Sequence, residues 1–143
     1  MRKLVSLLLA LAMVLSLASA AMAEEPYTLD IYWVGGGDNE AVRLGVEAAI
    51  NEYIEPLINA KVSFHIIAWG DWNDKAINAL QSGEKMDMIF TADWEGYGIE
   101  VACGLLMPLD DLLDQYGQGI KENLPQTFLD GVKVNGVLYG IPT

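Results

Sequence analysis

Apolar residues along this chain follow two periods, one typical of strands and the other typical of helices. Nearly continuous apolar runs over 27–34, 62–68 and 86–91 predict three strands. Apolar residues spaced three or four positions apart predict helices over 39–54 and 73–80. Because these strands and helices alternate, the pattern predicts an α/β fold with a mostly parallel sheet flanked by helices.

Cap and turn residues mark where the first two helices should begin and end. Asp38 is expected to cap the first helix, and Pro56 is expected to mark its end. Ser82–Gly83 is expected to stop the second helix. The apolar side of the first helix carries Val42, Val46, Ala49, Ile50 and Tyr53.

Two further helices and a hairpin are expected in the last third of the chain. Helical patterns cover 97–105 and 108–116, and two short strand-like runs flank Asn135–Gly136. Asn-Gly is the pair that a type I′ turn favours, because both positions need a positive φ. We therefore expect a tight β-hairpin around this dipeptide.

The first 23 residues have the pattern of an export signal. Basic residues precede an apolar stretch over 4–18, and Ala21-Met22-Ala23 offers the small residues that signal peptidase requires. A retained membrane anchor is the alternative, which we disfavour because a spanning helix needs about 20 apolar residues. We expect residues 1–23 to be a cleaved signal peptide and residues 24–143 to act outside the cell or in the periplasm.

Charge and the scarcity of metal ligands exclude several classes of function. Acidic residues number 20 against 8 basic ones, which gives a net charge of −12. Nucleic acid is therefore a poor partner, because phosphate backbones require basic patches. Cys103 is the only cysteine, so no internal disulfide forms, and none stands at the cleavage site to carry a lipid anchor. With His65 as the only histidine, we expect neither a metal site nor a cofactor.

Tryptophan and aspartate occur together where each of the three predicted strands ends. The loops are 33–39, 69–72 and 91–94, and each contains at least one residue of both types. In an open parallel sheet, ligands bind beyond the carboxyl ends of the strands, because the loops converge there. We therefore expect the three loops at one edge of the sheet, around a shared site.

Such loops suit a sugar, because a flat aromatic face can stack on C–H bonds while carboxylates accept hydrogen bonds from hydroxyls. Two other interpretations stay open. The rings and acids could be core packing and helix caps, or Asp71, Asp93 or Glu95 could serve as acid and base in a secreted carbohydrate-active hydrolase. A phosphate loop at the glycines 35–37 is rejected, because the G-x-G-x-x-G spacing and the P-loop lysine are absent and acidic residues follow.

Four segments resemble, in order, the amino-terminal part of the extracellular solute-binding proteins of bacterial ABC importers, the family that includes the maltose-binding protein. LDIYWVGGGDNE resembles the first strand and loop of the family. NALQSGEKMDMIF resembles its helix, turn and third strand, and GLLMPLDDLLDQYG resembles a later helix start. GVKVNGVLYGIPT resembles the hairpin that precedes the second lobe.

The resemblance implies a receptor that delivers a ligand to an importer, not an enzyme. It implies a periplasmic-binding-protein-like lobe, a sugar or oligosaccharide ligand, the permease subunits of an ABC importer as partners, and a monomer. Family members close two lobes around the ligand, whereas residues 24–143 would supply only the first, so we expect the lobe to be truncated before the second. The ligand-binding residues implied are Trp33, Gly36, Asp38, Asn39, Trp69, Asp71, Trp72, Asp93, Trp94 and Tyr139.

Overall fold

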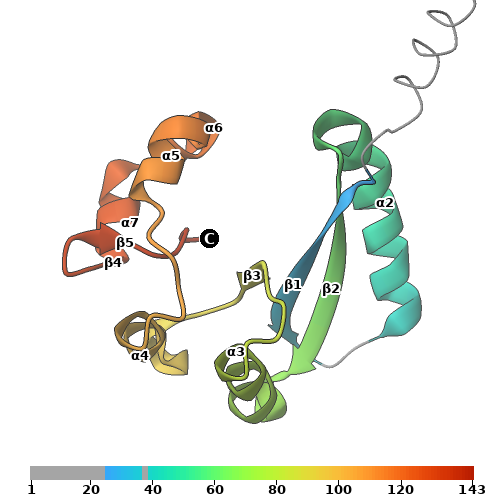
Figure 1. The fold of residues 1–143 in the computed structure, drawn as a ribbon, viewed down its shortest axis with the longest axis horizontal. Coiled ribbons are helices and arrows are strands. Elements are labelled where there is room, and N and C mark those ends of the chain that lie inside the picture. The colour runs from blue at the N-terminus through green and yellow to red at the C-terminus, as the bar shows by residue number, and fades with distance from the viewer. Residues whose placement is uncertain (1–24, 37–38) are drawn as a thin grey trace, which may run out of the picture.

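Three parallel strands form the sheet around which the chain is arranged (Figure 1). The computed structural model describes residues 25–36 and 39–143, so the expected signal peptide and the expected cap at Asp38 lie outside the described residues. The strands β1 (Tyr27–Gly35), β2 (Ala60–Ala68) and β3 (Met88–Ile89) lie in the order β2-β1-β3. The helices are α2 (Glu40–Ile58), α3 (Asn78–Gln81), α4 (Tyr97–Ala102), α5 (Asp110–Tyr116), α6 (Gln118–Asn123) and α7 (Gln126–Gly131), and the hairpin consists of β4 (Lys133–Val134) and β5 (Val137–Leu138).

Both strand pairs are parallel, so the three carboxyl ends lie at one edge of the sheet. In the β1–β2 register, Trp33 lies opposite Ile66. β3 is shorter than the predicted 86–91, but the N–H of Phe90 donates to the carbonyl of Tyr32 at 2.9 Å and continues the contact with β1. The predicted α/β class with a parallel sheet is confirmed.

Helix α2 extends further than predicted, and the residue that caps it is Asn39. The Asn39 side chain accepts a hydrogen bond from the N–H of Val42 at 3.3 Å. The helix continues through Pro56, so the predicted end there is wrong. It ends before Asn59, which has a left-handed φ of 50° and donates from its N–H to the carbonyl of Glu55 at 2.9 Å. Asparagine tolerates this conformation better than most residues.

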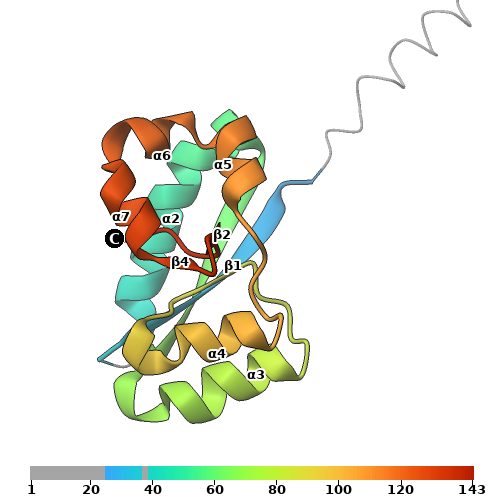
Figure 2. The same cartoon turned by 90° about the vertical axis from the view of Figure 1, so that its left-hand side faces the viewer.

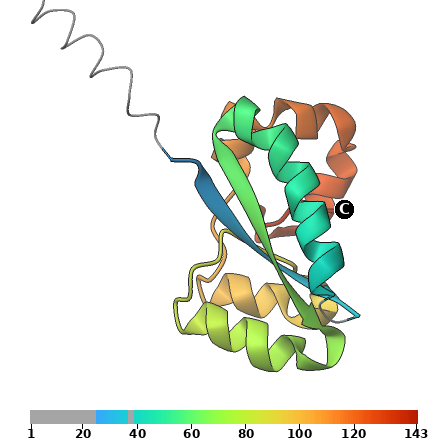
Figure 3. The same cartoon turned by 90° about the vertical axis from the view of Figure 1, so that its right-hand side faces the viewer.

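Side chains of α2 cover the outer edge of β2, along which the helix runs in Figure 3. The N–H of Val62 donates to Oδ1 of Asn51 at 2.7 Å, and Nδ2 of Asn51 donates to the carbonyl of Val62 at 3.1 Å. The N–H of Phe64 donates to the buried Glu47 carboxylate at 2.7 Å. An edge strand leaves backbone groups without partners, and this helix supplies them.

This orientation leaves most of the predicted apolar face of α2 exposed. Val42, Val46, Ala49 and Tyr53 are exposed, and only Ile50 is half-buried. Four of the five residues of the predicted apolar face are therefore not buried. The physical reason is that the edge of β2 requires polar side chains, and those of α2 lie on a different side of the helix.

Two groups of apolar side chains form the core. The first lies against the sheet and consists of Tyr32, Val34, Trp72 and Ala76, with partly buried neighbours that include Phe90. The second joins α5, α7 and β5 through Leu113, Leu129 and Leu138. In Figures 1 and 2, α3 and α4 lie toward the end at which β1 and β2 finish, and Figure 1 shows α5–α7 on the side of the sheet away from α2.

The other predicted elements follow in the expected order, whereas α6 and α7 lie in a stretch for which no element was predicted. A π-helical turn at Asn73–Ile77 leads into α3, and the helix stops at Ser82 and Gly83, whose φ is 75°. α4 and α5 are shorter than the helices predicted there. Asn135 and Gly136 have φ values of 52° and 83°, which confirms the predicted hairpin turn. None of the helices within residues 25–36 and 39–143 is long and apolar enough to cross a membrane.

Candidate ligand-binding site

Three tryptophan rings meet one phenylalanine ring at the carboxyl ends of the strands. The ring centroids of Trp33, Trp69 and Trp72 lie 5.5, 5.9 and 5.8 Å from that of Phe90. The interplanar angles are 64°, 83° and 79°, so all three contacts are edge to face. The first two predicted loops and the end of β3 therefore meet, as the parallel topology requires.

The tryptophans differ sharply in exposure. Trp33 is 41% exposed, Trp69 is 54% exposed and Trp94 is 76% exposed, whereas Trp72 has no exposed surface. Trp72 packs in the core, which is the packing alternative that the sequence left open for it. The aromatic surface available to a ligand comes from the other three rings.

Two of the predicted acidic residues lie at the surface of this end. Asp71 is exposed and forms an ion pair with Lys75 at 2.8 Å, one helical turn further on. Asp93 is exposed and opens a short 3-10 turn, Asp93–Glu95, which follows β3. Both carboxylates are accessible to a ligand hydroxyl. The carboxylate of Asp71 would interact with Lys75 and with the ligand at the same time.

A second pair of acids lies beneath the third loop. Glu100 is 2% exposed, and its Oε2 accepts a hydrogen bond from the Thr91 hydroxyl at 2.6 Å. Its Oε1 and the Oε2 of Glu95 are buried and have no hydrogen-bond partner among the described residues. Burial raises the pKa of the Glu100 carboxyl, and the negative charge of Glu95 raises it further. Sequence reasoning missed Glu100, because an acid in a helix usually indicates an exposed face.

The hairpin approaches this end through Tyr97 of α4. The Tyr97 hydroxyl donates to the carbonyl of Val132 at 2.8 Å, and a Cβ added at Gly140 would lie 3.6 Å from the Tyr97 ring. Tyr139, one of the predicted ligand-binding residues, is half-buried beside Gly140. Tyr139 thus belongs to a segment that packs against Tyr97 of α4.

The first predicted loop, 33–39, lies within the described residues except at positions 37 and 38. Gly36 is exposed directly after β1, Asn39 caps α2, and Asp38 lies outside the described residues. A groove of about 430 Å³ opens beside Asn39 and Trp33, between α2 and the first two strands. Its lining is mostly apolar and consists of Trp33, Asn39, Val42, Arg43, Val46, Phe64 and Ile66.

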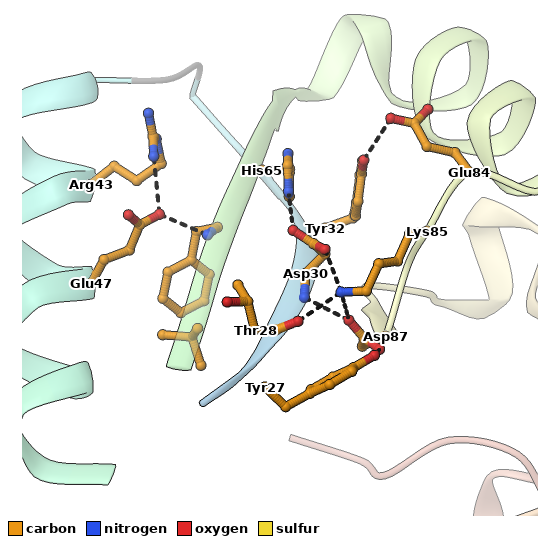
Figure 4. Close-up of polar contacts among 12 residues, drawn as sticks. Tyr27, Thr28, Asp30, Tyr32, Arg43, Glu47, His65, Glu84, Lys85 and Asp87 are labelled. Atoms are coloured by element: carbon orange, nitrogen blue, oxygen red, sulfur yellow. Dashed lines mark hydrogen bonds and ion pairs between the residues drawn. The ribbon is translucent and has the colours of Figure 1, made fainter. Parts of the chain in front are cut away.

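The amino end of the sheet carries a polar network that the sequence did not predict (Figure 4). Lys85 forms ion pairs with Asp30 at 2.6 Å and with Asp87 at 2.8 Å. Asp87 also accepts hydrogen bonds from the Tyr27 hydroxyl at 2.5 Å and from the N–H of Asp30 at 2.8 Å. His65 bonds to the second oxygen of Asp30 at 2.9 Å. These bonds fix β3 to β1 at the end opposite the tryptophans.

The ionisation of this network follows from its bonds. Hydrogen bonds from Lys85 and His65 hold the pKa of Asp30 below its usual range. Burial acts to raise the pKa of Asp87, but the hydrogen bonds from Lys85, Tyr27 and the Asp30 N–H outweigh it and lower that pKa to about 2. Within the described residues, no group of three or more histidine, cysteine, aspartate or glutamate side chains could hold a metal ion.

Comparison with known proteins finds that this chain is similar to carbohydrate receptors. No family model matches the chain. A carbohydrate ABC transporter substrate-binding protein of Streptococcus pneumoniae serotype 4 is 26% identical over 123 residues, which are 86% of this chain and 24% of the relative. The crystal structure of the N-glycan transport solute-binding protein NgtS from Streptococcus pneumoniae matches with a TM-score of 0.72 and 25% identity, over 81% of this chain and 25% of NgtS. NgtS in complex with Man5GlcNAc gives the same TM-score at 26% identity, over 81% of this chain and 24% of that one.

The chain therefore spans about a quarter of the length of the proteins that it matches. Over that quarter, the predicted resemblance to sugar-binding solute-binding proteins of ABC importers is confirmed in both sequence and fold.

Proposed function

We propose that this chain captures a carbohydrate at the carboxyl end of its sheet, as part of the substrate-binding component of an ABC importer. The observation that carries the proposal is the convergence of Trp33 and Trp69 on Phe90, with both tryptophans exposed. Contiguous exposed apolar surface commonly marks an interaction site or a ligand-binding groove. The similarity to a carbohydrate receptor and to NgtS supports the same conclusion.

The chemistry of these residues favours an uncharged sugar with several hydroxyls. Exposed tryptophan faces can stack on the C–H side of a pyranose, and the carboxylates of Asp71 and Asp93 can accept hydroxyl hydrogen bonds. NgtS has been crystallised with Man5GlcNAc. We therefore propose an oligosaccharide containing mannose and N-acetylglucosamine as the first ligand to test.

We propose further that the protein works outside the cytoplasmic membrane, as a monomer that passes its ligand unchanged to membrane permease subunits. Residues 1–23 would direct export and be removed by signal peptidase. The chain shares only a quarter of the length of its relatives, so it would make only part of the ligand contacts. If about 4 kcal/mol of binding free energy remains, the dissociation constant of this chain is on the order of millimolar.

Calorimetric titration of the chain with Man5GlcNAc tests the proposal. Trp69→Ala should weaken binding about fivefold, because stacking contributes roughly 1 kcal/mol. Asp93→Ala should weaken it about tenfold through the lost hydrogen bonds to a charged acceptor. Tyr116→Ala is the matched control, because Tyr116 is 73% exposed on α5, away from the strand ends.

Two outcomes would contradict the proposal. Binding that is absent, or equally strong in all variants, would show that these strand ends do not form a carbohydrate site. An accompanying assay for released reducing ends separates a receptor from a hydrolase. Release that Asp93→Ala abolishes would place the protein among carbohydrate-active enzymes instead.

A further inference from the structure

Phe90 is the residue on which the aromatic cluster converges, although its position in an apolar run gave no sign of this role. Its N–H donates to the carbonyl of Tyr32 at 2.9 Å, so its backbone is fixed to β1 just beyond β3. Its ring then contacts three tryptophans from the ends of the other two strands. The ring is half-buried and lies among its partners at centroid distances between 5.5 and 5.9 Å.

Of the three tryptophans that contact Phe90, one is buried in the core and two are exposed. Trp72 is fully buried and packs with Tyr32 in the first core group. Trp33 and Trp69 are about half exposed, so solvent and not packing surrounds the rest of each ring. Phe90 therefore connects a fixed core ring to two rings that are available to a ligand.

Edge-to-face contacts are directional, because the positive edge of one ring is attracted to the negative face of another. Each contact therefore restricts the orientation of a tryptophan as well as its position. An exposed tryptophan without such a contact would have to lose rotamer freedom when a ligand stacks on it, and that loss lowers affinity.

We propose that Phe90 is a positioning residue for carbohydrate binding, which sets the orientation of the Trp33 and Trp69 rings before the ligand arrives. This inference rests on the proposed function of the strand ends. Phe90 does not have to touch the ligand, and the carboxylates of Asp71 and Asp93 play no part in the effect.

Three single variants of the chain test the inference. Phe90→Leu keeps an apolar side chain of similar volume but removes the ring, and Phe90→Tyr keeps the ring. Phe128→Leu is the control, because it also removes a phenylalanine ring, but Phe128 lies on α7, away from the strand ends. For each variant we would measure the near-ultraviolet circular dichroism, the far-ultraviolet spectrum and the affinity for Man5GlcNAc.

We expect Phe90→Leu to weaken binding about tenfold, with an unchanged far-ultraviolet spectrum and a reduced near-ultraviolet tryptophan signal. Phe90→Tyr should restore affinity to within about twofold, and Phe128→Leu should leave both the affinity and the tryptophan signal close to those of the parent. Equal losses of affinity in the two leucine variants would overturn the inference, because they would show a general effect of removing a phenylalanine ring. An unchanged affinity or an unchanged tryptophan signal in Phe90→Leu would overturn it as well.

Failure of the proposed function can be told apart from failure of this inference. If the parent chain binds no glycan, the proposed function fails, whereas the near-ultraviolet spectra still show whether Phe90 orders the tryptophans. If the parent binds and only the Phe90 comparison fails, the carbohydrate site stands without a positioning role for this residue.

Discussion

The two ends of the sheet use polar and aromatic groups in opposite ways. At the amino end, Lys85 forms ion pairs with Asp30 and Asp87. Tyr27 is hydrogen-bonded to Asp87, and His65 is hydrogen-bonded to Asp30. At the carboxyl end, tryptophan faces remain exposed, and buried oxygens of Glu95 and Glu100 have no partner among the described residues. The charged groups of the amino end thus find their partners within the protein, whereas the carboxyl end keeps an exposed aromatic surface that can bind a ligand. A charged cluster alone therefore does not mark a ligand site.

The largest expected effect separates two tryptophans of the same loop. Trp72→Ala should lower the free energy of unfolding by about 3 to 5 kcal/mol, because the ring is fully buried and its removal leaves a cavity. Trp69→Ala should lower it by only about 1 kcal/mol, because more than half of that side chain is already exposed. Urea denaturation of both variants provides the measurement. Losses of equal size would mean that Trp69, too, is mainly a core residue.

The parallel arrangement that brings the strand ends together could be predicted from the sequence, because strand–helix–strand crossovers return each strand in the same direction. The exposure of individual rings could not. Trp69 and Trp72 stand three residues apart, and which of them is buried depends on the short 3-10 turn at Trp69–Asp71. No apolar period describes so short a turn.

The amino-end network and the role of Phe90 also escaped prediction, for a different reason. Asp30 and Asp87 lie 57 residues apart in the chain, and only the pairing of β3 with β1 brings them together. The orientation of α2 likewise depends on which strand is at the edge of the sheet, since Asn51 and Glu47 contact the backbone of β2 there. Strand order is a tertiary property, and local periodicity does not contain it.

An intermediate effect is expected at the amino end. Asp87→Asn should lower the free energy of unfolding by about 2 kcal/mol, because it removes a charged acceptor that bonds Tyr27, Lys85 and the Asp30 N–H. The pKa of Asp87 is lowered from 3.8 to about 2, so its stabilisation is present above pH 3.8 and is lost as the pH falls toward 2. Urea denaturation between pH 2 and pH 7 should therefore show a smaller acid-induced loss in the variant.

Glu52→Gln is the matched control for this change, because Glu52 is an exposed acid on α2. It should alter stability by less than about 0.5 kcal/mol. An Asp87→Asn variant that behaves like this control at every pH would show that the network contributes nothing to stability, and the contrast between the two ends would then disappear.

The smallest expected effect comes from an acid-to-amide change at the carboxyl end, and its sign is opposite to that of Asp87→Asn. Glu100 is 2% exposed, and burial raises its pKa above the usual 4.5, so the folded protein binds a proton more readily than the unfolded chain. Its favourable contribution is therefore fully present below pH 4.5 and is lost as the pH rises through the raised pKa. Glu100→Gln cannot ionise and can still accept the hydrogen bond from Thr91.

The Glu100→Gln variant should therefore match the parent near pH 4 and exceed its free energy of unfolding at pH 7, by up to about 1 kcal/mol. Urea denaturation at the two pH values measures the difference, with Glu52→Gln again as the control. A loss of stability at pH 7 would mean that the protein stabilises the ionised Glu100 carboxylate as strongly as it stabilises the carboxylates at the amino end. Stability gained at pH 7 would show that this end of the sheet, unlike the amino end, keeps a buried acid that the protein satisfies poorly.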